Sequence, residues 1–196
     1  MATFIHERMK FFFIHVPKTG GMTVSNFFFD GSASPQRLAY SKKNEQLGIH
    51  TGIERVSRLL GDEFEDYFSF AYYRNTWDWS FSLYRYIKRT PSHPKYEAVH
   101  QLSFEEYVFQ IAEDFFRPQK PLVAQGNEIR VTQLDDYQNF ADSFGKVLNN
   151  LGYENSHFKS HNRATAKDYR SVYDKKMMIK IGDIYEEDIE FFGFDF

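Results

Sequence analysis

Two apolar runs of strand length stand out in the pattern of hydrophobic and polar positions, Phe11 to Val16 and Phe68 to Tyr73. Each predicts a buried strand, because a short apolar run bounded by turn signals is typical of a strand inside a sheet. The segment Glu128 to Leu134 predicts a further strand, and Arg37 to Ser41 a short one. Pro17 ends the first run, and the chain then enters a glycine-rich turn.

Apolar residues at helical spacing occur between and after these runs. The periodic apolar positions Ile53, Val56, Leu59 and Leu60 predict a helix that Gly61 can end. The other predicted helices are the segment that runs to Asp30, Trp77 to Lys88, Phe104 to Ala112, Phe140 to Leu151, Asp168 to Tyr173 and Tyr185 to Phe192. Because strands alternate with helices, we expect one α/β domain over residues 1–196, with a P-loop-like, mainly parallel central sheet and helices on both faces.

The turn after the first strand has the composition of an anion-binding loop. Lys18, Thr19, Gly20 and Gly21 connect the strand to a segment that can start a helix. Such a turn points backbone N–H groups and the positive end of the helix dipole at one place, and Lys18 adds a full charge. The loop therefore predicts a phosphate or sulfate site. The alternative is a tight Gly-Gly turn beside a surface lysine.

A second candidate anion site follows the second strand. Arg74 stands at the carboxyl end of that strand, and Ser82 lies about two turns into the next predicted helix. A guanidinium fork and a hydroxyl in these positions can bind one phosphate together. Taken alone, Arg74 would be better explained by an ion pair with Asp78. Two motifs in this order, each after a strand, favour anion binding.

Both segments resemble the nucleotide motifs of the sulfotransferases that use 3′-phosphoadenosine 5′-phosphosulfate (PAPS), in their carbohydrate branch of Golgi-type, heparan 2-O-sulfotransferase-like enzymes. Residues 17–23 are similar to the family loop Pro-Lys-Thr-Gly-Gly-Thr-Ser, with Met22 in place of a hydroxyl residue. Residues 74–84 are similar to its 3′-phosphate motif, Arg-Asn-Pro-x-Asp-Arg-x-x-Ser-x-Tyr. Thr76 replaces the proline and Trp79 the second arginine. The hydroxyl of Thr76 can itself cap the helix.

The resemblance extends over nearly the whole chain. The step Tyr137 to Phe140 takes the place of the family's Phe-Glu-Asn-Leu, with Gln138 for the glutamate. His161 and Asn162 stand where a family loop closes over the nucleotide, and His157 to Ser160 fits that place as well. The last segment resembles the family's ending at Tyr173, Tyr185, Asp188, Phe192, Gly193, Phe194 and Phe196.

The resemblance implies an enzyme that moves the sulfuryl group of PAPS to a hydroxyl of a carbohydrate or glycolipid and releases adenosine 3′,5′-bisphosphate. Lys18 and the loop amides would stabilise the charge that grows on the bridging oxygen as the S–O bond breaks. No metal ion is expected. The implied nucleotide-binding residues are Pro17, Lys18, Thr19, Gly20, Gly21, Met22, Thr23, Arg74, Ser82, His161 and Asn162.

The transfer also needs a base for the acceptor hydroxyl, and His50 is our candidate. An imidazole suits proton removal near neutral pH, and the family often carries a catalytic or substrate-facing histidine between the two motifs. A helix-entry histidine that only bonds to backbone is the alternative. Glu54 and His161 are the next candidates for the base. We expect His15, two residues before Pro17, to be a hydrogen-bonded strand residue.

Composition narrows the class of protein. The chain has 196 residues, a formal net charge of −3 and no cysteine, which excludes disulfides, thiolate zinc sites and cysteine nucleophiles. The pair His157 and His161 lacks a nearby carboxylate to complete a metal site. Scattered basic residues argue against a nucleic-acid partner. No apolar run has membrane-spanning length and no signal segment opens the chain, so we expect a cytoplasmic protein without a membrane span.

Two other functions fit parts of the sequence. A nucleotide or small-molecule kinase of the P-loop type would bind Mg-ATP, but its G-x-x-x-x-G-K-[ST] motif has the lysine after the glycines, whereas Lys18 precedes them. A catalytically weak relative that only binds nucleotide would fit the departures at Thr76, Trp79 and Gln138. The sequence predicts neither the acceptor's identity nor the oligomeric state.

Overall fold

The computed structural model describes residues 2–29, 43–115, 117–153, 158 and 168–196. The chain divides into two compact units. The first consists of Met1–Tyr73 with Gln119–Arg163, and the second of Arg74–Pro118 with Ala164–Phe196. The single domain over residues 1–196 stays a prediction.

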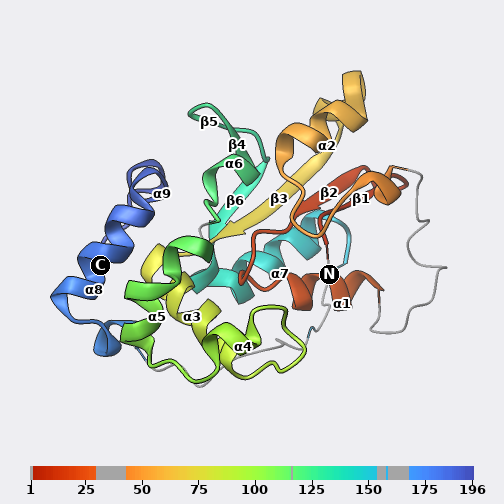
Figure 1. The fold of residues 1–196 in the computed structure, drawn as a ribbon. Coiled ribbons are helices and arrows are strands. Elements are labelled where there is room, and N and C mark those ends of the chain that lie inside the picture. The colour runs from red at the N-terminus through yellow and green to blue at the C-terminus, as the bar shows by residue number, and fades with distance from the viewer. Residues whose placement is uncertain (1, 30–42, 116, 154–157, 159–167) are drawn as a thin grey trace. The chain divides into compact units, whose positions relative to one another are not determined.

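The first unit is built on a mixed, mainly parallel sheet, which in the described residues has four strands in the order β1-β2-β3-β6 (Figure 1). The strand β1 is antiparallel to β2, whereas β2, β3 and β6 run parallel. The predicted α/β class and mainly parallel sheet are therefore confirmed. The four strands are β1 (Phe4–His6), β2 (Phe11–Ile14), β3 (Phe68–Tyr73) and β6 (Gln133–Asp136).

Of the two other predicted strands, one is divided between two elements and the other is not described by the structure. The strand predicted over Glu128 to Leu134 is wrong as one element. Its first part, β5 (Glu128–Ile129), forms a hairpin with β4 (Ala124–Gln125), and its last two residues begin β6. Gly126, with a φ of 58°, makes the tight turn of that hairpin. The segment predicted as a strand over Arg37 to Ser41 lies outside the described residues.

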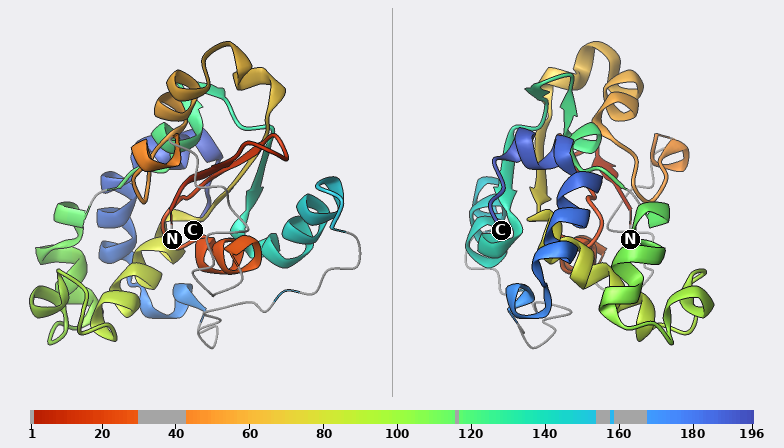
Figure 2. Two further views of the ribbon diagram at one scale, coloured as in Figure 1. Left: turned by 90° about the vertical axis from the view of Figure 1, so that its right-hand side faces the viewer. Right: turned by 60° about the vertical axis from the view of Figure 1, so that its left-hand side comes forward.

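Aromatic side chains form the core of the first unit. Phe11 and Phe13 of β2 point to one face, because successive strand residues alternate, and they pack with residues of α1 and α7. Figure 2 shows α1 and α7 on the same side of the sheet. Phe12 points the other way, where Phe64 and Tyr67 cover it.

Helices connect the strands of the first unit. They are α1 (Gly21–Phe29), α2 (Ile53–Leu60), α6 (Lys120–Val123) and α7 (Phe140–Asn150), with 3-10 helices η1 (Asn44–Gln46), η2 (Gly61–Asp66) and η4 (Tyr137–Asn139). Of these, α1, α2 and α7 lie close to the predicted bounds, whereas the sequence did not predict α6 or the 3-10 helices. Gly61 caps α2, as predicted, with a φ of 55°. Buried Ile53, Val56 and Leu60 confirm the predicted apolar face of this helix.

The second unit is helical. Its elements are α3 (Thr76–Lys88), α4 (Tyr96–Val99), α5 (Phe104–Gln110), α8 (Lys175–Ile184) and α9 (Glu186–Phe192), with 3-10 helices η3 (Ala112–Phe115) and η5 (Tyr169–Val172). The helix predicted over Asp168 to Tyr173 is only a 3-10 turn. The sequence did not predict α8, although Met177 and Ile181 repeat at helical spacing and are buried.

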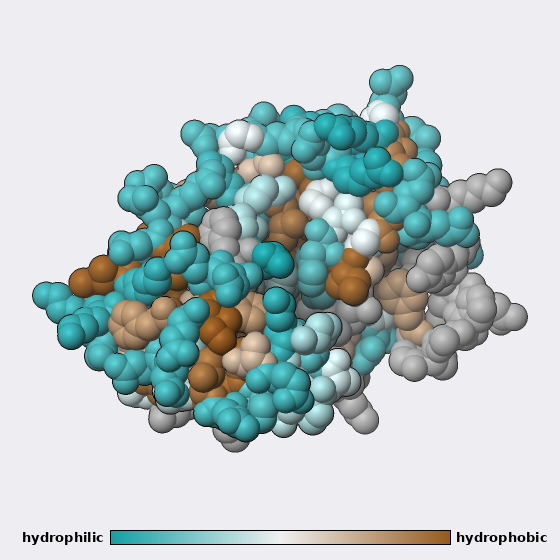
Figure 3. Space-filling view, viewed as in Figure 1, coloured by the Kyte–Doolittle hydropathy of each residue, from teal (hydrophilic) through white to brown (hydrophobic). Residues whose placement is uncertain are grey.

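The surface is mostly hydrophilic on the face shown in Figure 3. Among the described residues, the large hydrophobic side chains that are exposed are Ile49, Phe109, Ile129 and Ile179. No helix in the described segments combines the length and the apolar character that crossing a bilayer requires.

Candidate functional site

The turn after β2 is tightly shaped. Lys18 and Gly20 have positive φ angles of 64° and 84°, a conformation that glycine adopts freely and lysine only when its surroundings hold it there. A Cβ on Gly20 would lie 2.7 Å from the ring of Phe140, and one on Gly21 would overlap the ring of His15. Packing therefore requires both glycines of the predicted loop.

The helix that follows begins inside the predicted motif. The carbonyl of Gly20 accepts hydrogen bonds from the amides of Thr23 (2.8 Å) and Val24 (3.2 Å). The helix α1 therefore starts at Gly21, and its first-turn amides lie at the loop. Thr19 is fully buried, and its hydroxyl donates to the carbonyl of Val16 at 2.8 Å. The Thr19 side chain thus closes the turn, and Lys18 supplies the charge of the loop.

His15 lies directly behind this loop. The residue is 6% exposed, and its Nδ1 has no hydrogen-bond partner among the described residues. This differs from the fully hydrogen-bonded strand histidine that we expected. Burial, together with the neighbouring charges of His50 and Lys18, lowers the pKa of His15 to about 3. The ring is therefore neutral near physiological pH.

The buried ring of His15 should make the protein less stable in acid. In the unfolded chain His15 would titrate near 6.5, and in the fold near 3, so between these values the unfolded state binds the additional proton. The contribution of His15 to the free energy of unfolding is therefore fully present above pH 6.5. It is lost as the pH drops toward 3, and the loss is about 3 kcal/mol at pH 4. Urea titrations from pH 7 to 4 should show this loss of stability in the wild type and a smaller loss in His15→Phe. The same dependence of the free energy of unfolding on pH in both proteins would contradict the prediction.

His50 lies beside His15, in the loop before α2. Its Nδ1 is 3.0 Å from the carbonyl oxygen of His15, and the two ring centroids are 4.7 Å apart. Because His15 precedes Lys18 by three residues, this contact links the candidate base to the anion loop. Glu54, the next candidate, is exposed and forms an ion pair with Arg58 one turn further along α2.

In the second unit, Arg74 contacts both predicted partners at once. Its Nε and Nη2 donate to the carboxylate of Asp78 at 2.8 and 2.9 Å, and its Nη1 donates to the hydroxyl of Ser82 at 3.1 Å. The side chains of Arg74 and Asp78 are only 14% and 20% exposed. The ion pair of Arg74 with Asp78 and the hydrogen bond of Arg74 to Ser82 therefore occur together, and the Asp78 carboxylate orients the guanidinium.

The start of α3 corrects one prediction and explains a departure from the family motif. Asn75, and not Thr76, caps the helix: its side-chain oxygen accepts the amide of Trp77 at 3.1 Å. The buried hydroxyl of Thr76 has no hydrogen-bond partner in the described part of the chain. Trp79 is 2% exposed and packs on the ring of Tyr185, so the position of the family's second arginine is a core position here.

The remaining predicted residues fall into two groups. His157, His161 and Asn162 lie outside the described residues, so their roles stay predictions. Two C-terminal positions of the resemblance have structural roles: the Tyr173 hydroxyl donates to the carbonyl of Trp77 at 2.8 Å, and Gly193 ends α9 with a φ of 67°. Among the described side chains, no group of three or more His, Asp or Glu could hold a metal ion.

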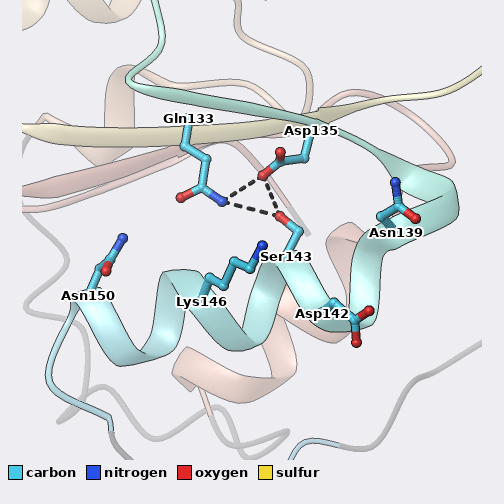
Figure 4. Close-up of a pocket in the computed structure, with 7 residues that line it drawn as sticks. All are labelled: Gln133, Asp135, Asn139, Asp142, Ser143, Lys146 and Asn150. Carbon is cyan, nitrogen blue, oxygen red and sulfur yellow. Dashed lines mark hydrogen bonds between the residues drawn. The ribbon is translucent and has the colours of Figure 1, made fainter.

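A polar pocket of about 450 Å³ lies between β6 and α7 (Figure 4). Both Gln133 Nε2, at 2.6 Å, and the Ser143 hydroxyl donate to the carboxylate of Asp135. The lining residues are Gln133, Asp135, Asn139, Asp142, Ser143, Lys146 and Asn150. Charged and polar side chains along the edge strand β6 oppose pairing with a strand of another molecule. We assign this pocket to the polar edge of the sheet, and no predicted site residue lines it.

Comparison with known proteins identifies the same family that the two motifs resemble. A model described as "Sulfotransferase family" matches residues 1–195. No curated protein matches the chain, and no solved structure does. The match includes the anion loop, His50 and the Arg74 segment within one alignment.

Proposed function

We propose that this chain, which belongs to the sulfotransferase family, transfers the sulfuryl group of PAPS to a hydroxyl of a carbohydrate or glycolipid. The family is one of enzymes that use PAPS. The observation that carries the proposal is the family match over both anion motifs, with Arg74 already oriented against Ser82. The saccharide acceptor follows from the resemblance to the carbohydrate branch, and a cytoplasmic location is part of the proposal.

The pairing of β2 with β3 supports the binding of one nucleotide by both motifs. The two strands are parallel, with Ile14 opposite Ala71, so their carboxyl ends lie at the same edge of the sheet. Ligands of open α/β sheets bind at that edge. In the proposal, the loop around Lys18 binds the phosphosulfate, and Arg74 with Ser82 binds the 3′-phosphate.

Three groups of this chain then share the chemistry. PAPS, when bound, supplies the sulfuryl group. Lys18 and the first-turn amides of α1 stabilise the negative charge that develops on the phosphate oxygen as its bond to sulfur breaks. His50 accepts the proton of the acceptor hydroxyl as the acceptor oxygen forms its bond to sulfur. The products are the sulfate ester and adenosine 3′,5′-bisphosphate, and no step requires a metal ion.

Adenosine 3′,5′-bisphosphate should stabilise the protein more than ATP does. A ligand at 100 times its dissociation constant adds about 2.7 kcal/mol to the free energy of unfolding, which for a chain of this size raises Tm by roughly 5–10 °C. Arg74→Ala should remove most of this increment, because it deletes the guanidinium proposed to bind the 3′-phosphate. Thermal melts with adenosine 3′,5′-bisphosphate and with adenosine 5′-monophosphate measure the preference directly.

The matched control is Arg85→Ala, which removes the same charge from α3 but lies outside the motif. It should keep the preference for the 3′-phosphate. If Arg74→Ala still discriminates between the two nucleotides, the 3′-phosphate site is misplaced. A larger Tm increase with Mg-ATP would favour the kinase, and stabilisation without sulfuryl transfer would favour a relative that only binds nucleotide.

A further inference from the structure

We propose that Thr3 is a positioning residue of this enzyme, which holds the loop that carries His50 against the end of β2. The inference rests on the proposed role of His50 as the base. Thr3 directly precedes β1 and is 2% exposed, so its polar atoms bond to protein rather than to solvent. What makes this residue unusual is the position of its three partners.

Thr3 hydrogen-bonds on both sides of His50. Its amide donates to the carbonyl of Ile49 at 3.1 Å, and its hydroxyl donates to the carbonyl of Thr51 at 2.9 Å. The same hydroxyl accepts the amide of His15 at 3.1 Å. One side chain thus connects the loop around His50 to the first residue after β2.

The loop that carries His50 is held together by its own hydrogen bond, so the hydrogen bonds of one further residue are enough to fix its position. The amide of Gly48 donates to the Thr51 hydroxyl at 2.7 Å, which joins the two ends of the four-residue segment. Thr3 bonds to Ile49 and Thr51 within that segment. A change at Thr3 should therefore displace His50 relative to Lys18, although the hydrogen bonds of Thr3 run to backbone groups of Ile49, Thr51 and His15.

The contact with His15 also selects the tautomer of His50. A carbonyl oxygen can only accept a hydrogen bond, so in the neutral ring the Nδ1 at 3.0 Å from the His15 oxygen carries the proton. The Nε2 then carries the lone pair that a base needs. Because Thr3 holds the amide of His15 and the backbone on both sides of His50, it fixes the geometry of this bond.

Thr3→Val is the decisive variant, because valine keeps the shape of the side chain and removes the hydroxyl. We expect kcat to fall by about tenfold to a hundredfold, as small displacements of a catalytic group do. The dissociation constant for adenosine 3′,5′-bisphosphate should stay within about twofold, since the hydrogen bonds of Thr3 go to residues outside the 17–23 loop. Thr3→Ser keeps the hydroxyl and should restore kcat to within about threefold of the wild type.

A matched control separates positioning from stability. The hydroxyl of Thr132 accepts the amide of Ser69 on β3 at 3.1 Å, as Thr3 does for His15, but away from His50. Thr132→Val should lower Tm and leave kcat unchanged. If Thr3→Val and Thr132→Val have the same kcat, the proposal is wrong.

Nitrogen-15 NMR of the histidine rings gives a readout that needs no turnover. The signals of His50 are assigned by their loss in His50→Gln. In the wild type the neutral ring should be protonated at Nδ1, and in Thr3→Val the Nε2-protonated form should gain population. A wild-type ring protonated at Nε2 would overturn the proposal even if no Thr3 variant folds. If His50→Gln leaves kcat unchanged, the base assignment fails, while the tautomer ratio still reports whether Thr3 positions His50.

Discussion

Replacing His50 by glutamine should lower kcat by about a hundredfold to ten-thousandfold, the usual contribution of a general base. Glutamine can still bond to the His15 carbonyl through its amide, but it cannot accept a proton. The dissociation constant for adenosine 3′,5′-bisphosphate should change by less than about twofold, because the loop and Arg74 remain. Single-turnover transfer from PAPS to a saccharide acceptor measures the chemical step apart from product release.

His100 provides the control for this experiment. Its Nδ1 also contacts a backbone carbonyl, that of Tyr96, at 3.1 Å, which is the purely structural role that His50 would otherwise have. His100→Gln should leave kcat unchanged. If the two glutamine variants behave alike, His50 is a structural residue, and Glu54→Gln and His161→Gln become the variants to measure.

Replacing Lys18 by alanine should lower kcat by about a hundredfold to a thousandfold, the cost of losing one preorganised donor at a developing negative charge. The effect is expected on the rate more than on the dissociation constant, because the charge on the bridging oxygen is largest in the transition state. Lys18→Arg should recover part of the rate, since the positive charge stays but a planar guanidinium replaces the compact ammonium group. Pre-steady-state transfer rates at saturating PAPS test both variants.

Lys10 is the natural control for Lys18, because it is the other described lysine with a positive φ, at 50°. It pairs with Glu63 on the surface at 2.6 Å. Lys10→Ala removes a charge from the same kind of backbone position and should leave the transfer rate unchanged. An equal loss in both variants would show that a strained turn, and not the charge of Lys18, explains the result.

The parts of the fold that the sequence predicts well are those with a continuous local pattern. The strand Phe68–Tyr73 and the helix Ile53–Leu60 have the predicted bounds, because apolar runs and a capping glycine mark them. The three-residue strand β1 was missed, since so short a segment has no period. Thr76 was predicted to cap α3 from its own chemistry, but Asn75, one residue earlier, makes that bond.

The anion loop could be predicted because its residues are contiguous, whereas the support of His50 could not. Thr3, His15 and Thr51 are far apart in the sequence and meet only through the pairing of β1 with β2. No local pattern identifies a lone threonine near the N-terminus. Trp79 likewise shows its role only in the fold, where it fills the core of the second unit.

The two rings that enclose the glycines of the turn after β2 have a consequence for the kinetics of donor capture. Phe140 and His15 leave no room for a side chain at Gly20 or Gly21, so packing already shapes the turn, and the entropy of ordering it is lost during folding and not at the encounter with the donor. A receptor that is already shaped has no such term in its affinity. The turn itself should then need no slow rearrangement after contact with the donor.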